Sequence, residues 1–192
     1  EVEPENWQHC FTVPRELKIR IGVDGAKKVF QTPIGELNKL RTGEVIVIDD
    51  TFSKKVSGQG VENHGEKAAN VREYVSEYDE LDVLCDGVQG YFSVSLGDGV
   101  TFMYDGEELS LSLTPECGYG RTMRRARIAA VNSLRILVDS SIAEFYVNEG
   151  ELVFTTRYYK KEVGTRICFD MPGAAVSVHP MQAMSVDWPE HI

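Results

Sequence analysis

Long apolar runs and closely spaced cysteines are both missing from this sequence of 192 residues. The longest apolar runs, such as Val45 to Ile48, have four residues, whereas a membrane-spanning helix needs about 20. No C-x-x-C pair is present, which argues against a zinc-ribbon framework. Four cysteines are also too few for a disulfide scaffold in a chain of this size. We expect separate buried thiols, a reducing cytoplasmic compartment and no membrane partner; the cysteines are Cys10, Cys85, Cys117 and Cys168.

Positive charge is scarce, with 20 Lys and Arg against 30 Asp and Glu and a formal charge of −10. This balance argues against nucleic acid as a partner, because phosphate binding needs a basic surface. The 42% of apolar residues is enough for a buried core. The sequence contains no G-x-G-x-x-G, Walker, H-E-x-x-H or G-x-S-x-G motif, so no cofactor and no metal is expected. The histidines at 9, 64, 179 and 191 are isolated, and a surface or capped core position is favoured for each.

Short segments of alternating polarity dominate the chain. In the segment 91–96, Phe92, Val94 and Leu96 alternate with serines, and Asp-Gly turns follow at 98–99 and 105–106. Such dense strands exclude a βαβ fold and favour an all-β antiparallel sandwich or barrel. The predicted strands are 16–21, 45–48, 91–96, 100–104, 109–113, 134–138, 142–147, 152–158, 166–169, 175–178 and a closing strand at 183–186.

One short helix is predicted near the N-terminus. Thr32 can cap it, Pro33 suits its first position, and Gly43 lies just past its end. Apolar residues at 34, 37 and 40 share one face of this helix. The segment 68–78 has helical spacing but β-forming residues, so its structure stays open between helix and strand.

Two groups of charged residues could carry chemistry, and each has a simpler interpretation. Asp139 and Glu144 flank a turn, and a carboxylate pair about 5–5.5 Å apart could act as glycosidase acid and nucleophile. The favoured interpretation is that Asp139 organises its turn and Glu144 meets an arginine across the sheet. The other group contains four arginines: Arg121, Arg124, Arg125 and Arg127. They could bind an anion, but in so acidic a chain the favoured interpretation is that they are solvated side chains on a strand.

Three segments carry more specific motifs. Trp7 is followed by T-V-P-R-E-L at 12–17, and 32–41 reads T-P-I-G-E-L-N-K-L-R. The segment 139–150 reads D-S-S-I-A-E-F-Y-V-N-E-G, and T-T-R-Y-Y follows at 155–159. In this order they resemble the W…T-x-P-R-E-L, P-x-x-E-L-x-x-L-R, D-x-S-x-x-E-x-F-x-N-x-G and T-x-R-x-Y patterns of glycoside hydrolase family 32. That family contains the invertases, sucrose-6-phosphate hydrolases and fructan hydrolases.

The resemblance implies a two-sheet, jelly-roll-like C-terminal β-sandwich at 44–192, a linker helix at 32–43, and residual strands of a five-bladed propeller at 1–31. It also implies that the catalytic carboxylates lie in that propeller, in N-D-P, R-D-P and E-C-P motifs. This chain contains neither N-D-P nor R-D-P. Glu116-Cys117 is followed by Gly118 instead of Pro, and it comes after P-R-E-L, whereas the family's E-C precedes it. No catalytic residue is therefore expected here, and Asp139 and Glu144 inherit structural roles.

Three functions from different classes follow. The first is an accessory domain of a retaining β-fructofuranosidase-type hydrolase. Its expected partner is the catalytic propeller of the same parent chain, and a homodimer is also expected. The second is a carbohydrate-binding module that would use Trp7 or Trp188, although packing at domain edges is favoured for both. The third is a pure protein-interaction domain. The sequence shows no signal peptide. Because it opens with Glu1 and lacks an initiator Met, we expect it to be a piece of a longer protein.

Overall fold

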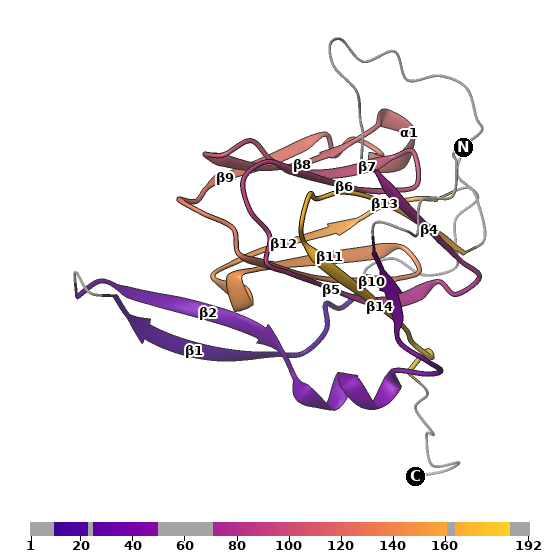
Figure 1. The fold of residues 1–192 in the computed structure, drawn as a ribbon, viewed down its shortest axis with the longest axis horizontal. Coiled ribbons are helices and arrows are strands. Elements are labelled where there is room, and N and C mark those ends of the chain that lie inside the picture. The colour runs from indigo at the N-terminus through magenta and orange to yellow at the C-terminus, as the bar shows by residue number, and fades with distance from the viewer. Residues whose placement is uncertain (1–9, 23–24, 50–70, 161–163, 185–192) are drawn as a thin grey trace.

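Two six-stranded antiparallel sheets pack face to face in the computed structural model, which describes residues 10–22, 25–49, 71–160 and 164–184 (Figure 1). The predicted all-β sandwich is confirmed. The first sheet has the order β12-β11-β10-β5-β14-β3, with strands Ile46–Ile48 (β3), Glu80–Asp86 (β5), Ser133–Asp139 (β10), Ile142–Val147 (β11), Leu152–Arg157 (β12) and Ala175–Pro180 (β14). The second has the order β4-β13-β6-β7-β8-β9, with strands Arg72–Ser76 (β4), Phe92–Leu96 (β6), Val100–Tyr104 (β7), Glu108–Leu113 (β8), Met123–Arg127 (β9) and Thr165–Asp170 (β13).

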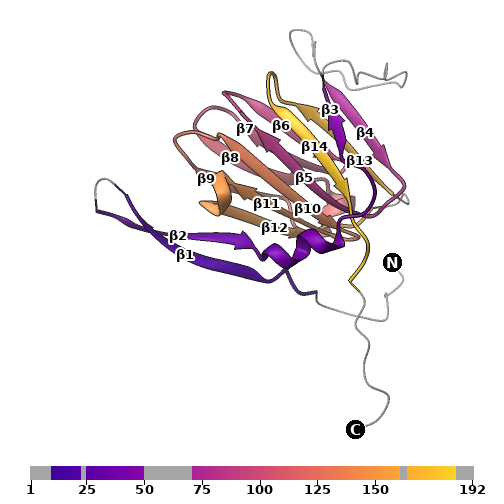
Figure 2. The same cartoon turned by 60° about the horizontal axis from the view of Figure 1, so that its bottom comes forward.

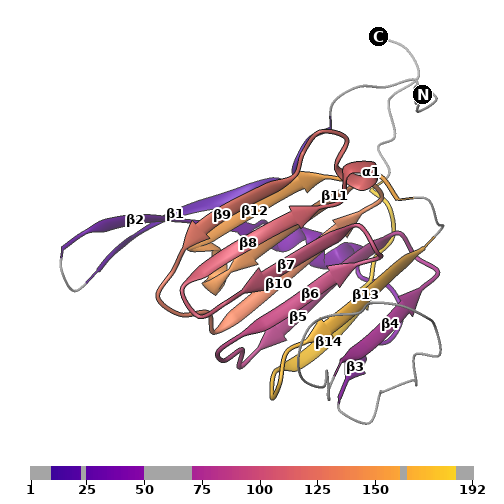
Figure 3. The same ribbon diagram turned by 90° about the horizontal axis from the view of Figure 1, so that it is seen from above.

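The main core lies between these two sheets, and it is built by the period-two alternation of the strands. Figure 3 looks onto the second sheet with the first sheet behind it. Phe102 of β7 stacks on Phe145 of β11 with ring centroids 4.5 Å apart, which joins the two sheets at the centre. All six residues predicted to point inward are at most 2% exposed: Phe92, Val94, Ile136, Val138, Phe145 and Val147.

A separate hairpin, Arg15–Ile21 (β1) paired with Lys27–Pro33 (β2), lies against the outer face of the first sheet (Figure 2). The free end of this hairpin extends beyond the sandwich (Figure 1). Its strand β1 alternates as predicted, but Leu17, Ile19 and Ile21 are 68%, 68% and 69% exposed. The apolar face of a strand is normally covered, so the hairpin presents an unpartnered apolar surface within the described part of the chain.

The predicted N-terminal helix is shorter and tighter than expected. It is a 3-10 helix, Gly35–Leu40 (η1), and Ile34 occupies its N-cap position without a side-chain hydrogen bond. The expectation that Thr32 caps the helix and Pro33 opens it is wrong, because both residues end β2. Their backbones pair with Glu16 and Arg15 of β1, and this pairing holds them in the extended conformation.

Several further elements correct or complete the prediction. Within the ambiguous segment 68–78, Arg72–Ser76 is a strand, and residues 68–70 lie outside the described part. The strands β2 and β5 and the short helix Pro115–Gly118 (α1) had no predicted counterpart, whereas β9 is the strand favoured for the arginines at 124, 125 and 127. Of the expected closing strand at 183–186, residues 183 and 184 are not in a strand and the other two lie outside the description. No helix among the described residues is long and apolar enough to cross a membrane.

Candidate functional site

The outer face of the first sheet carries a second, smaller apolar cluster, and we call this region the joint. The cluster brings the sandwich residues Leu137, Tyr146 and Met181 against Leu37 of η1. Partly buried residues around the start of the hairpin and η1 pack against it. The joint therefore fastens the N-terminal segment to the sandwich by apolar burial, and polar contacts on either side of it fix the geometry.

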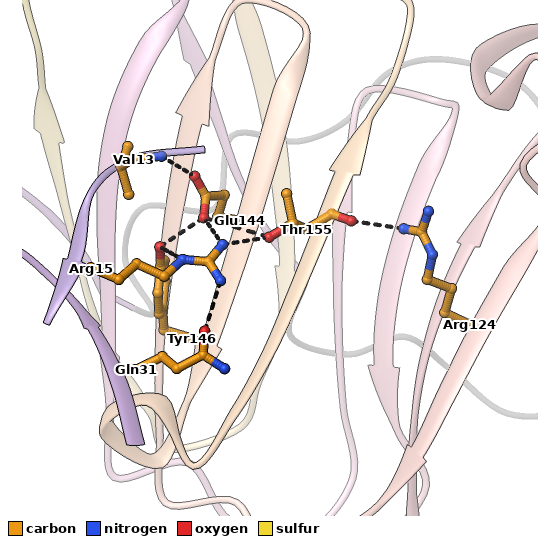
Figure 4. A network of polar contacts seen from close by, with 7 residues as sticks. All are labelled: Val13, Arg15, Gln31, Arg124, Glu144, Tyr146 and Thr155. Atoms are coloured by element: carbon orange, nitrogen blue, oxygen red, sulfur yellow. Dashed lines mark hydrogen bonds and ion pairs between the residues drawn. The ribbon is translucent and has the colours of Figure 1, made fainter. Parts of the chain in front are cut away.

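Glu144 is the centre of the first polar network of the joint (Figure 4). Its side chain is 2% exposed and accepts hydrogen bonds from the Val13 amide at 2.8 Å and the Tyr146 hydroxyl at 2.7 Å. It also forms an ion pair with Arg15 of β1. A buried carboxylate is costly unless it is paired and hydrogen-bonded, and Glu144 meets both conditions. The arginine predicted for Glu144 is thus present, but it comes from the hairpin and not from a neighbouring strand of the same sheet.

Arg15 connects Glu144 to further groups on both sides of the joint. Its guanidinium donates to the Tyr146 hydroxyl at 3.1 Å, to Gln31 Oε1 at 3.1 Å and to Thr155 Oγ1 at 2.8 Å. Burial, and then the hydrogen bond to Glu144, raise the pKa of Tyr146. Burial works against the charged form of Arg15, but its bond to Glu144 and the nearby Tyr146 leave the net pKa raised. Both groups therefore stay hydrogen-bond donors, and both Glu144 oxygens are engaged in hydrogen bonds within the joint.

Asp82 is the centre of a second network, at the other end of the joint. It is fully buried, and its oxygens accept from Arg41 Nε and Nη2 at 2.8 and 2.6 Å. Arg135 donates to the same carboxylate from Nε and Nη2, both at 2.9 Å. A further bond at 3.2 Å joins Arg135 to Asn38 of η1. Arg15 and Arg41, the arginines of the two N-terminal motifs, thus each meet a buried carboxylate of the sandwich.

The Asn-Glu-Gly end of the third motif shapes the same joint. Asn148 Oδ1 accepts from the Asn132 amide at 2.8 Å, and its Nδ2 donates to the Ala130 carbonyl at 2.9 Å. Gly150 has φ of +89°, and a Cβ there would lie 1.9 Å from the carbonyl oxygen of Gln31 in β2. Glycine is therefore required where the sandwich and the hairpin backbones meet.

Acidic residues crowd the turn ends of β5 and β10. Glu80 pairs with Asp139 in the strand register. Burial, and then the neighbouring Asp139 and Asp79, raise the pKa of Glu80. Partial burial and Glu144 likewise raise the pKa of Asp139. The turn-organising role expected for Asp139 stays a prediction.

Replacing Glu80 with glutamine is expected to raise the melting temperature at neutral pH. A carboxyl whose folded pKa lies above its unfolded value of about 4.3 binds its proton more tightly in the folded chain. Stability therefore falls as pH rises through that window, and glutamine removes the penalty. Melting curves of both proteins from pH 3 to pH 8 should separate on the alkaline side and meet at the acid end. A difference that does not change with pH would contradict this account.

The remaining sequence candidates lie apart from the joint or outside the described residues. Arg124, Arg125 and Arg127 lie on the edge strand β9 and are exposed, and Arg124 donates to the Thr155 carbonyl at 2.8 Å (Figure 4). Glu116 is exposed on α1, far along the chain from both networks. Trp7 and Trp188 lie outside the described part, as do the histidines at 9, 64 and 191.

All four cysteines carry free thiols, as expected. The expectation that they are buried is correct for Cys85 and Cys117 but wrong for Cys10, which is exposed, and Cys168 is only partly buried. Burial raises the pKa of Cys85 to about 12, so this thiol is inert at neutral pH. Within the described residues, no group of three His, Cys, Asp or Glu side chains is arranged to hold a metal ion.

Sequence reasoning found Arg15, Arg41, Glu144 and Gly150 through the motifs, but it missed Asp82. The signal for Asp82 was weak, because in E-L-D-V-L-C-D the acidic residues take the alternate positions that a strand normally turns to solvent.

Comparison with known proteins finds a family match for part of the chain. Residues 101–185 match the family model described as "Glycosyl hydrolases family 32 C terminal". Over this stretch, which is less than half of the sequence, the chain is similar to that C-terminal domain. The chain is 26% identical over 158 residues to the sucrose-6-phosphate hydrolase of Bacillus subtilis (strain 168), covering 80% of this chain and 29% of that protein. It is 28% identical over 175 residues to the Staphylococcus xylosus enzyme of the same name, covering 86% and 32%.

Solved structures agree with the fold. A sucrose-6-phosphate hydrolase from Lactobacillus gasseri superimposes with a TM-score of 0.58 at 18% identity, over 88% of this chain and 33% of that one. An exo-inulinase from Aspergillus awamori gives a TM-score of 0.63 at 12% identity, over 90% and 36%. The chain spans about a third of the length of the curated relatives it matches.

Proposed function

We propose that this chain is the accessory C-terminal part of a retaining β-fructofuranosidase-type hydrolase, whose parent hydrolyses sucrose 6-phosphate or sucrose. The relatives named sucrose-6-phosphate hydrolase, with which the chain aligns over about a third of their length, support this proposal. The catalytic carboxylates would lie in a propeller domain, since the chain contains no N-D-P or R-D-P segment. We divide the chain at 1–31, 32–43 and 44–192, as the motifs indicate.

The exposed face of the hairpin is the observation that carries the supporting role. Leu17, Ile19 and Ile21 point away from any described residue that could bury them, while the start of the same hairpin is fixed by Arg15 and Glu144. When a partner covers this apolar strand face, the association is stabilised by about 25 cal/mol for each Å² of apolar surface removed from water. The propeller is the partner we assign, and the joint fixes the angle at which the hairpin meets it. A homodimer through the same face is the competing arrangement.

The chain alone is expected to hydrolyse no sucrose, raffinose or sucrose 6-phosphate, because its buried carboxylates are already bonded to arginines. The same chain joined to the coding sequence upstream of Glu1 is expected to be active, with N-D-P and R-D-P segments in the added part. Release of reducing sugar measures both. Turnover by the chain alone that disappears in Glu144→Gln, with an unchanged circular dichroism spectrum, would overturn the accessory role.

A further inference from the structure

Uncharged side chains fill the centre of the outer face of the second sheet. Figure 3 looks onto this face, and Figure 1 shows the hairpin and η1 on the opposite side of the sandwich. The apolar residues of β6, β7 and β8 alternate into the main core, so the residues between them point outward. Of these outward residues only Glu108, the first of β8, is charged. The others are partly exposed: Ser93, Ser95, Thr101, Met103, Ser110 and Ser112.

This composition differs from that of an ordinary solvated surface. In this chain 26% of the residues are charged, and charged residues belong mostly to the surface of a protein. Loss of charge from the centre of a patch, with polar groups kept at its rim, is the compositional pattern of a protein–protein interface. The outer face of the second sheet therefore has the pattern of an interaction surface.

One cross-strand row on this face has opposite charges at its two ends. The register places Asp170 of β13 opposite Ser93, and the row continues through Met103 and Ser110 to Arg125 of β9. With strands about 4.8 Å apart, the two ends are separated by roughly 19 Å, which is too far for an ion pair within one chain.

Both end groups are available to a partner. Asp170 is partly exposed and forms no ion pair with any described residue. Arg125 is 59% exposed, and its contact with Glu108 is a surface pair of 3.5 Å. Exposed pairs of this kind contribute little, so an acidic partner can compete for the guanidinium.

The row is complementary to itself. A two-fold axis parallel to the strands and above β7 would stack the same face of two copies and reverse the order of their strands. Asp170 of one copy would then lie over Arg125 of the second copy, and the reverse pair would form at the same time. The two Met103 side chains would meet at the centre. Such an arrangement uses one patch on both subunits, as a two-fold interface must.

We propose that the outer face of the second sheet pairs two copies of this chain, with an Asp170–Arg125 ion pair at each end of the row. Six strands about 4.8 Å apart and about five residues long give a flat area of about 400 Å² per copy, the size of a transient interface. The expected dissociation constant is on the order of 10 µM. Because the joint lies on the opposite side of the sandwich, pairing leaves the hairpin free and does not depend on the function proposed above.

Sedimentation of the full chain at increasing concentration tests this pairing. Physiological salt screens the net charge of −10 that both copies carry. Arg125→Asp and Asp170→Arg should each raise the dissociation constant at least tenfold, because each variant places like charges at both contacts. An equimolar mixture of the two variants should form a heterodimer about as tight as the unchanged dimer, because opposite charges then meet at both contacts.

Two control variants separate this face from other sources of pairing. Arg124→Asp makes the same charge change on the next residue of β9, whose side chain points toward the first sheet and donates to the Thr155 carbonyl. It should leave the dimer intact. Ile19→Ser reduces the apolar surface of the hairpin and should also leave the dimer intact.

Circular dichroism spectra check that each variant is folded. If a charge-reversal variant loses the native spectrum, the neutral Arg125→Gln and Asp170→Asn replace it and should still weaken the dimer. A chain that stays monomeric up to about 100 µM, tenfold above the expected constant, would overturn the proposal. So would a dimer that resists both charge reversals, a mixture that stays monomeric, or a dimer lost in Ile19→Ser.

Discussion

Replacing Asp82 with asparagine is expected to lower the free energy of unfolding by about 3 kcal/mol, because it breaks a buried ion pair from one side. The carboxylate is fully buried and accepts four charged hydrogen bonds, two each from Arg41 and Arg135. An asparagine would turn one amide N–H group toward a guanidinium and leave two cations without a counter-charge. At roughly 2–4 °C per kcal/mol for a chain of this size, the melting temperature should fall by roughly 6–12 °C.

An exposed carboxylate–arginine pair provides the control. Glu149 accepts from Arg20 at 2.7 Å, but both side chains are more than half exposed. Glu149→Gln should therefore change stability by less than about 1 kcal/mol. Thermal melts of Asp82→Asn, Glu149→Gln and the parent chain at one salt concentration make the comparison. Equal losses in the two variants would mean that burial of Asp82 adds nothing to its pairing.

Asp82 also marks the limit of prediction from this sequence. Strands with strict alternation, such as β6 and β8, were predicted nearly to the residue, because their serines and apolar side chains separate cleanly onto two faces. The strand β5 was missed, although it lies in the middle of the first sheet. Its residues Leu81, Val83 and Cys85 face the main core, so a period of two is present in this strand. What the alternation does not reveal is that Asp82, on the other face, is buried and paired with Arg41.

The joint was predictable in its parts but not in its assembly. The motifs supplied Arg15, Arg41 and Glu144, and elementary electrostatics required a partner for any of them that became buried. Arg15 and Glu144 are 129 positions apart in the sequence, and no local pattern connects them. Only the fold, which lays the hairpin across β11, brings the guanidinium to the carboxylate.

Replacing Gly150 with alanine is expected to separate the hairpin from the sandwich. The new Cβ would lie 1.9 Å from the Gln31 carbonyl oxygen, and the residue would keep a φ of +89° that side chains disfavour. Backbone strain of this kind costs about 1–3 kcal/mol, and the clash adds to it because backbone, not a flexible side chain, stands in the way. Since β2 must move, the contact of Arg15 with Gln31 and Glu144 weakens with it.

Amide hydrogen exchange of β2 and limited proteolysis within the hairpin locate this loss. Both should accelerate at least tenfold in Gly150→Ala, while the amides of β6 and β7 in the main core change less. Gly173→Ala is the matched control, since Gly173 also has a positive φ, of +74°, but a Cβ there would meet no described atom within 4 Å. That variant should show the strain without the displacement, and its hairpin should stay protected. Equal exchange of β2 in the two alanine variants would show that the glycine serves the turn alone, and that the close approach of hairpin and sandwich does not depend on it.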